Sequence, residues 1–169
     1  MTPGGDLVLL RHGIALDRSV AARRNLRDDE RPLTREGIEK TVAAAAGLAA
    51  FVRARPATVW TSPLLRARQT ADIAAEAFGA PPPRVHTALA PGEDPACALE
   101  EAVKTGANAI LLVGHAPDLG DFAAELLGAR PGTCPLKKAG AAVLRARDGR
   151  MRLVAHLPPR VLRGLSPGA

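Results

Sequence analysis

Two hydrophobic patterns alternate along the chain. Short, uninterrupted apolar runs at residues 7–10 and 109–113 suit strands that are buried on both faces of a sheet. After Thr34, which is a suitable helix N-cap, apolar residues such as Ile38, Val42 and Ala45 recur every three or four positions to about residue 53. The patterns therefore predict strands that alternate with amphipathic helices.

The same patterns place the remaining elements. We expect further strands at residues 58–61, 84–89, 141–147 and 150–156, and helices at residues 64–78, at residues 96–104 and from Pro117 onward. Ser62 is expected to cap the helix after the second strand, with Pro63 at its first position. Asp148 and Gly149 form a strong hairpin signal. Residues 14–33 are polar and charged, and we expect a long surface loop of a kind that is often functional.

This order of elements predicts an α/β fold. We expect a three-layer α/β/α sandwich with a mostly parallel central sheet and an antiparallel edge strand from the final hairpin. At 169 residues the chain fits a single domain, residues 1–169, and is too short to divide convincingly into two. Ligands of such sheets bind beyond the carboxyl ends of the strands. The residues that follow each strand are therefore the candidates for function.

Composition and charge narrow the classes of function. The chain has 23 Lys and Arg against 17 Asp and Glu, and its net charge of +6 favours an anionic partner. We expect no nucleic-acid partner, because the cations are scattered and the aromatic residues that could stack on bases make up only 2%. Cys97 and Cys134 match no metal-ligand or disulfide spacing, so neither a zinc site nor a disulfide framework is indicated. We expect no metal and no cofactor. No segment resembles a signal sequence or a membrane span, which predicts a cytoplasmic protein without a membrane partner.

Basic and imidazole side chains follow three of the expected strands. Arg11 and His12 follow the first strand, Arg66 lies one turn into the helix after the second, and His115 follows the strand at residues 109–113. These groups should meet at one edge of the sheet. Two guanidiniums and two imidazoles in one place suit a tetrahedral dianion, because arginine binds phosphoryl oxygens through paired hydrogen bonds. The sequence therefore predicts a phosphoryl site.

The segments around these residues resemble the histidine phosphatase superfamily, which is phosphoglycerate mutase-like in fold, and within it the small phosphohistidine phosphatases of the SixA type. The resemblance covers nearly the whole chain. It is carried by residues 9–13 (LLRHG), 31–37 (RPLTREG), 61–71 (TSPLLRARQTA) and 113–117 (VGHAP). It implies that His12 is the nucleophile, that Arg11 and Arg66 bind the phosphoryl group, and that His115 stabilises this group from the far side.

The chemistry of these groups agrees with those roles. A nucleophilic imidazole must be neutral, and repulsion from the guanidiniums of Arg11 and Arg66 is expected to lower the pKa of His12. Attack on phosphorus would form a phosphoimidazole, whose hydrolysis releases inorganic phosphate. Fixed cations can stabilise the charge on the transferring group without a metal.

The general acid is harder to assign. Many relatives with alcohol leaving groups use a carboxylate to protonate the departing oxygen, and the loop at residues 90–95 lies in about the right region. Glu93 is the candidate there, with a solvated loop carboxylate as the alternative interpretation. Asp17 and Asp118 lie near the matching segments and are further candidates. A phosphohistidine substrate would need less help from an acid, because its leaving group is an imidazole.

Our first hypothesis is an enzyme that removes phosphate from phosphohistidine on a signalling or phosphotransfer protein, since the chain lacks the large insertions that relatives use to enclose small substrates. The alternative is a phosphomonoesterase for a small phosphate ester, such as a sugar phosphate or nucleotide, with the same mechanism. A module that binds phosphorylated proteins without turnover is a different class, and turnover of any phosphoester would exclude it. A nucleic-acid binder would show steeply salt-dependent affinity.

Overall fold

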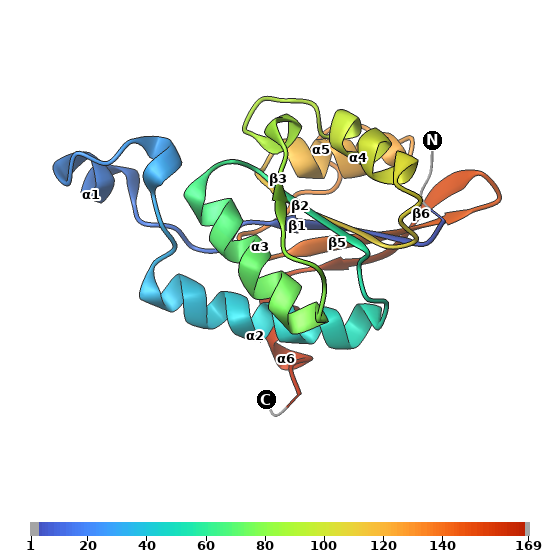
Figure 1. The fold of residues 1–169 in the computed structure, drawn as a ribbon, viewed down its shortest axis with the longest axis horizontal. Coiled ribbons are helices and arrows are strands. Elements are labelled where there is room, and N and C mark those ends of the chain that lie inside the picture. The colour runs from blue at the N-terminus through green and yellow to red at the C-terminus, as the bar shows by residue number, and fades with distance from the viewer. Residues whose placement is uncertain (1–3, 168–169) are drawn as a thin grey trace.

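The computed structural model describes residues 4–167 and contains one six-stranded sheet between two layers of helices (Figure 1). The strands, in chain order, are β1 (Asp6–Arg11), β2 (Thr58–Thr61), β3 (Arg84–Val85), β4 (Ile110–Gly114), β5 (Ala141–Arg147) and β6 (Arg150–Leu157). They lie in the order β3-β2-β4-β1-β5-β6. Strands β3, β2, β4 and β1 are parallel, and β5 runs antiparallel to both β1 and β6. The predicted α/β fold with an antiparallel hairpin at one edge is confirmed.

The helices cover both faces of the sheet. The helices α2 (Arg35–Val52), α3 (Leu65–Phe78) and α6 (Pro159–Gly164) pack on one face, and α4 (Pro95–Lys104) and α5 (Asp118–Leu126) pack on the other (Figure 1). Adjacent β1 residues alternate between the two hydrophobic clusters, with Leu9 on the α4 and α5 side and Leu10 on the α2 and α3 side. Within residues 4–167, none of the helices combines the length and apolarity that crossing a membrane requires.

The excursion at residues 14–33 leaves the sheet after β1 and ends at the start of α2. It contains the short helix α1 (Arg18–Arg23) and a 3-10 turn at Asp28–Glu30, and it projects from one end of the molecule (Figure 1). An isolated antiparallel bridge between Ala15 and Leu33 closes its base, where the Leu16 amide also donates to the Pro32 carbonyl at 2.8 Å. The closed base fixes where the far part of the excursion lies relative to β1.

Two predicted element boundaries are wrong. The helix α3 begins at Leu65 with Leu64 as its N-cap, so Ser62 is not the cap and Pro63 lies outside the helix. Strand β3 ends at Val85, four residues early, because the His86 ring accepts a hydrogen bond from the Ala88 amide and starts a 3-10 turn. In both places a side chain accepts a hydrogen bond from a nearby amide, Ser62 Oγ from Leu64 and the His86 ring from Ala88. Such local bonds compete with a continuous helix or strand.

Candidate active site

The carboxyl ends of β1, β2 and β4 meet at one edge of the sheet. The His12 amide donates to the Gly114 carbonyl at 3.0 Å, and the Ser62 amide donates to the Val113 carbonyl at 3.0 Å, so the residues just beyond the three strands stay in register. One cavity of about 610 Å³ opens there, and Arg11, His12, Arg66 and His115 all line it. The structure therefore brings these four predicted site residues together.

His12 is buried at the base of this cavity with one ring nitrogen occupied. Its Nδ1 lies 2.7 Å from the Gly13 carbonyl oxygen, and since a carbonyl can only accept, Nδ1 carries the proton and Nε2 keeps a free lone pair. Burial is the largest cause that lowers the pKa of His12 to about 3; the hydrogen bond to Gly13 opposes it, and the charges of His115, Arg66 and Arg11 add to it. The direction agrees with the sequence-based expectation, but burial outweighs the repulsion from the arginines.

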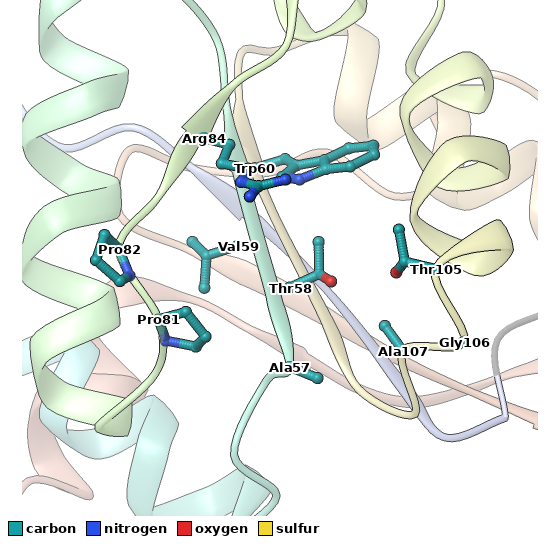
Figure 2. A pocket seen from close by; sticks show the side chains of 10 residues that line it. All are labelled: Ala57, Thr58, Val59, Trp60, Pro81, Pro82, Arg84, Thr105, Gly106 and Ala107. Atoms are coloured by element: carbon teal, nitrogen blue, oxygen red, sulfur yellow. The ribbon is translucent and has the colours of Figure 1, made fainter.

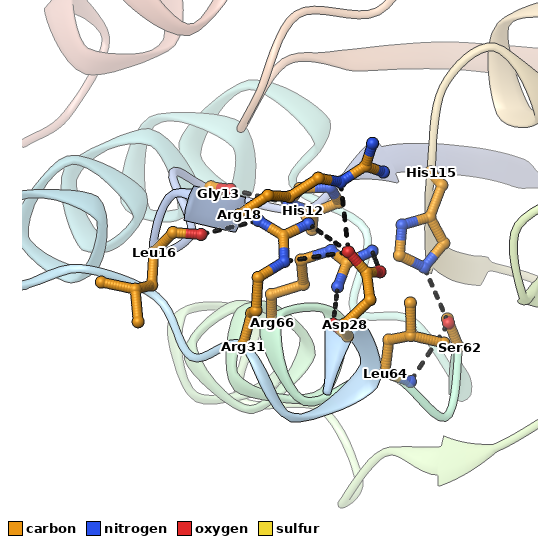
Figure 3. Close-up of polar contacts among 10 residues, drawn as sticks. All are labelled: His12, Gly13, Leu16, Arg18, Asp28, Arg31, Ser62, Leu64, Arg66 and His115. Atoms are coloured by element: carbon orange, nitrogen blue, oxygen red, sulfur yellow. Dashed lines mark hydrogen bonds and ion pairs between the residues drawn. The ribbon is translucent and has the colours of Figure 1, made fainter. Parts of the chain in front are cut away.

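His115 faces His12 across the cavity (Figure 3). The two ring centroids are 5.0 Å apart, and His115 Nε2 lies 2.8 Å from Ser62 Oγ. Ser62 Oγ also accepts a hydrogen bond from the Leu64 amide at 3.3 Å, which fixes the hydroxyl. Burial, followed by the charges of Arg66 and Arg11, lowers the pKa of His115 to about 4. Ser62 therefore orients His115, a role that the sequence did not reveal.

Each arginine of the site keeps one buried nitrogen free. Arg11 donates from Nη1 to the Leu136 carbonyl at 2.7 Å, and Arg66 donates from Nη1 and Nη2 to Asp28. Among the described residues, the Nε atoms of both arginines are buried without a hydrogen-bond partner. A buried donor without a partner is costly, and the Nε edge of a guanidinium is one that binds phosphoryl oxygens in pairs. Both arginines line the cavity of His12, and their guanidiniums are of the kind that binds phosphoryl oxygens.

Asp28 ties the excursion to the site. Its carbonyl oxygen accepts from Arg66 Nη1 at 2.7 Å and its Oδ2 from Arg66 Nη2 at 3.1 Å, while its Oδ1 accepts from Arg18 and Arg31 (Figure 3). Partial burial raises the pKa of Asp28, but Arg66 and Arg31 outweigh it and the net shift is downward. Sequence analysis missed this residue. The signal was an acidic run, residues 28–30, inside a basic segment.

The carboxylates considered as general acids lie in different places. Glu93 is exposed and lines a neighbouring cavity of about 420 Å³ together with Asp94 and Asp118, and that cavity does not include His12. Asp17 does line the cavity of His12, but it caps α1, where Oδ1 accepts from the Ser19 amide and hydroxyl. These hydrogen bonds lower the pKa of Asp17.

Other candidate groups lie away from His12. A cavity of about 360 Å³ opens at the amino ends of β2 and β4, where Trp60, Arg84 and two prolines line it (Figure 2). His86 stacks on Trp60 with ring centroids 4.8 Å apart, and His156 Nε2 lies 3.0 Å from the Pro135 carbonyl oxygen, which are structural contacts. Within residues 4–167, His, Cys, Asp and Glu side chains form no cluster that could hold a metal ion.

Comparison with known proteins agrees with this geometry. The family model of the histidine phosphatase superfamily (branch 1) matches residues 7–90. An uncharacterised protein of Picosynechococcus sp. is 39% identical over 155 residues, which are 89% of this chain and 90% of that protein.

Two solved structures are similar over nearly their whole length. The putative phosphohistidine phosphatase SixA from Agrobacterium tumefaciens has a TM-score of 0.74 and 25% identity, with 92% of this chain and 99% of that chain covered. The protein histidine phosphatase SixA complexed with tungstate has a TM-score of 0.76 and 25% identity, with 93% of this chain and 99% of that chain covered. The chain belongs to the histidine phosphatase superfamily, and it is a phosphatase of the SixA type.

Proposed function

We propose that the protein hydrolyses phosphohistidine on a signalling or phosphotransfer protein, through a covalent phosphohistidine on His12. Nε2 of His12 attacks phosphorus while the bond from phosphorus to the substrate imidazole breaks. Water then attacks the phosphoenzyme, which releases inorganic phosphate and restores His12. Arg11 and Arg66 hold the phosphoryl oxygens, and His115 donates a hydrogen bond to the same group.

The observation that carries this proposal is the state of two carboxylates at the site, Asp17 in the lining of the His12 cavity and Asp28 on Arg66. Hydrogen bonds with Ser19 lower the pKa of Asp17, and neighbouring arginines lower the pKa of Asp28, so both are ionised at neutral pH and hold no proton to donate. An alcohol leaving group needs such a proton. A phosphohistidine ring whose second nitrogen carries a proton departs as neutral imidazole, whose conjugate acid has an ordinary pKa of about 6.5, so the departing nitrogen needs no proton from a carboxyl group. The site therefore favours phosphohistidine over phosphate esters.

The proposal includes catalysis without a metal. The phosphoryl charge would be balanced by the two arginines, with the neutral imidazole of His115 as a further donor. We expect activity to be unchanged by a strong chelator, and restoration of lost activity by an added divalent cation would contradict this part. A cytoplasmic location also belongs to the proposal and can be tested by cell fractionation.

A substrate panel tests the proposed function. The purified protein is offered a phosphotransfer domain phosphorylated on histidine, free phosphohistidine, a sugar phosphate and a nucleotide, and phosphate release is measured. Because a missing general acid costs about 100-fold or more, we expect kcat/KM for both phosphohistidine substrates to exceed that for the esters by at least about 100-fold. His12→Ala should abolish this turnover, whereas His156→Ala, a matched change of an exposed histidine, should not.

The opposite preference would support the small-ester alternative. In that case Glu93 is the predicted general acid, reaching the leaving oxygen from the neighbouring cavity, and Glu93→Gln should lower turnover of esters by about 100-fold or more. Under our proposal, Glu93→Gln leaves hydrolysis of phosphohistidine unchanged.

A further inference from the structure

A second basic cavity opens beside the catalytic one. It has a volume of about 410 Å³, and its charged lining residues are Arg11, Lys40, Lys137, Lys138 and Arg163. None of the described residues that line it is a carboxylate. Arg11, Ile14 and Lys138 line both cavities, so the two adjoin. We call the part defined by Lys40, Lys137, Lys138 and Arg163 the lysine groove.

The positive charge of the lysine groove is only partly balanced. Lys40 pairs with Glu36 one turn earlier on α2. Lys137, Lys138 and Arg163 form no ion pair with any residue in the described range 4–167. Like charges that face one cavity repel each other, and an anion placed between them would relieve this repulsion.

The lysine groove is fixed relative to the nucleophile. The Ala139 amide donates to the carbonyl oxygens of both Arg11 and His12 at 3.1 Å, and the Arg11 amide donates to the Gly140 carbonyl at 3.1 Å. These bonds tie the segment that carries Lys137 and Lys138 to the end of β1. Arg163 follows the fully buried Leu162 on α6, which packs against α2. The backbone that carries these charges is therefore held in place beside the end of β1, so a ligand that reaches His12 also meets the groove.

We propose that the lysine groove binds acidic side chains that flank the phosphohistidine of the protein substrate. The inference rests on the proposed function, since it assigns a recognition site for that substrate. The lining favours a peptide over a second phosphate, because Ile14, Ala139 and Pro159 place apolar surface among the cations. An extended chain advances about 3.3 Å per residue, so residues a few positions from the phosphohistidine can enter the adjoining groove.

Two synthetic phosphohistidine peptides test this inference. They have the same length and sequence, except that the residues a few positions from the phosphohistidine, on both of its sides, are Glu in one and Gln in the other. We expect the wild-type protein to hydrolyse the Glu peptide with about tenfold higher kcat/KM, since a few exposed ion pairs together give about this factor. The preference should shrink at high salt, because screening weakens exposed charge pairs.

Charge reversal in the groove supplies the decisive comparison. Lys137→Glu/Arg163→Glu should remove the preference for the Glu peptide, and Lys137→Gln/Arg163→Gln should reduce it; the second variant covers the case in which the first does not fold. Lys104→Glu is the matched control, because Lys104 ends α4 near the amino end of β4, away from the catalytic edge. This control should keep the full preference.

The outcomes separate the inference from the proposed function. Equal kcat/KM for the two peptides, or a preference that survives both groove variants, overturns the inference, while hydrolysis of free phosphohistidine shows that the proposed function still stands. If the wild-type protein hydrolyses neither peptides nor free phosphohistidine but does hydrolyse esters, both fail together.

Discussion

At the residue scale, the site keeps two imidazoles neutral beside two guanidiniums. Burial is the first cause for both His12 and His115, and the arginine charges add to it. Arg11 and Arg66 both line the cavity that holds the two imidazoles. A phosphoryl dianion in this cavity would offset their positive charge, which agrees with the proposed function.

The neutral histidines make stability depend on pH. Their pKa values are lowered to about 3 and about 4 in the folded protein from 6.5, the ordinary value that the unfolded chain approaches. Between these limits the unfolded chain binds more protons, so the free energy of unfolding should fall as the pH drops from 6.5 toward 4. Each histidine contributes at most about 1.4 kcal/mol per pH unit to this fall in the free energy of unfolding. Urea denaturation at a series of pH values measures this slope.

A double variant separates the contribution of the two histidines to this pH dependence from the contribution of the carboxylates. His12→Asn/His115→Asn should show a shallower fall in stability over the same pH range. An identical slope in the variant and the wild-type protein would contradict the assignment of depressed pKa values to this pair.

At the element scale, the excursion between β1 and α2 acts as part of the site. Its 3-10 turn holds Arg66 through Asp28, and the bridge between Ala15 and Leu33 holds the excursion in place. Through these contacts a charged surface segment reaches a side chain of the candidate site. Asp28 is a positioning residue, since it acts through Arg66.

Removal of the Asp28 carboxylate should loosen Arg66 and leave the fold intact. We expect Asp28→Ala to lower kcat/KM by about 10- to 100-fold, as misplacement of a binding group does. Asp28→Asn, which keeps an acceptor oxygen, should fall between this variant and the wild-type protein. The control is Asp29→Ala, because Asp29 pairs with the exposed Arg27. Equal activity of Asp28→Ala and Asp29→Ala in steady-state kinetics would refute the positioning role.

Sequence patterns predicted elements better than the faces and contacts of those elements. Thr34 caps α2 as expected, with its hydroxyl accepting from the Gly37 amide at 2.9 Å. Ala45 of the predicted apolar stripe is buried, but Ile38 and Val42 are 41% and 50% exposed, because α2 also packs through Thr41, Ala44 and Leu48. Periodicity cannot show which of two adjacent stripes faces the sheet when alanine is common on both.

The same limit explains which site residues were predictable. The meeting of Arg11, His12, Arg66 and His115 follows from topology, because the carboxyl ends of neighbouring parallel strands share an edge. The contacts of Ser62 with His115 and of Asp28 with Arg66 join residues 53 and 38 positions apart. Such pairs depend on the three-dimensional path of loops, which no local pattern encodes.

At the scale of the whole molecule, one sheet is shared by two hydrophobic clusters. Successive residues of β1 and β4 contribute to opposite faces, so neither helical layer has a sheet of its own. On this basis we propose that residues 1–169 form a single domain. When the sheet unfolds, the helices on both of its faces should unfold with it.

A single cooperative transition is the expected result of unfolding. Trp60 is the sole tryptophan and belongs to the cluster under α4 and α5, whereas far-UV circular dichroism reports helices on both faces. Urea titrations followed by tryptophan fluorescence and by circular dichroism should therefore coincide. Separate midpoints would show that the two layers unfold independently and would argue against one domain.

The central claim concerns His12, and trapping the phosphoenzyme tests it most directly. The protein is mixed with a phosphohistidine substrate, quenched rapidly at alkaline pH and digested, and the phosphorylated peptide is located by mass spectrometry. The account predicts acid-labile phosphate on His12 that forms and decays at rates compatible with turnover, and none in His12→Ala. Phosphate on a different residue, or full turnover by His12→Ala, would contradict the account.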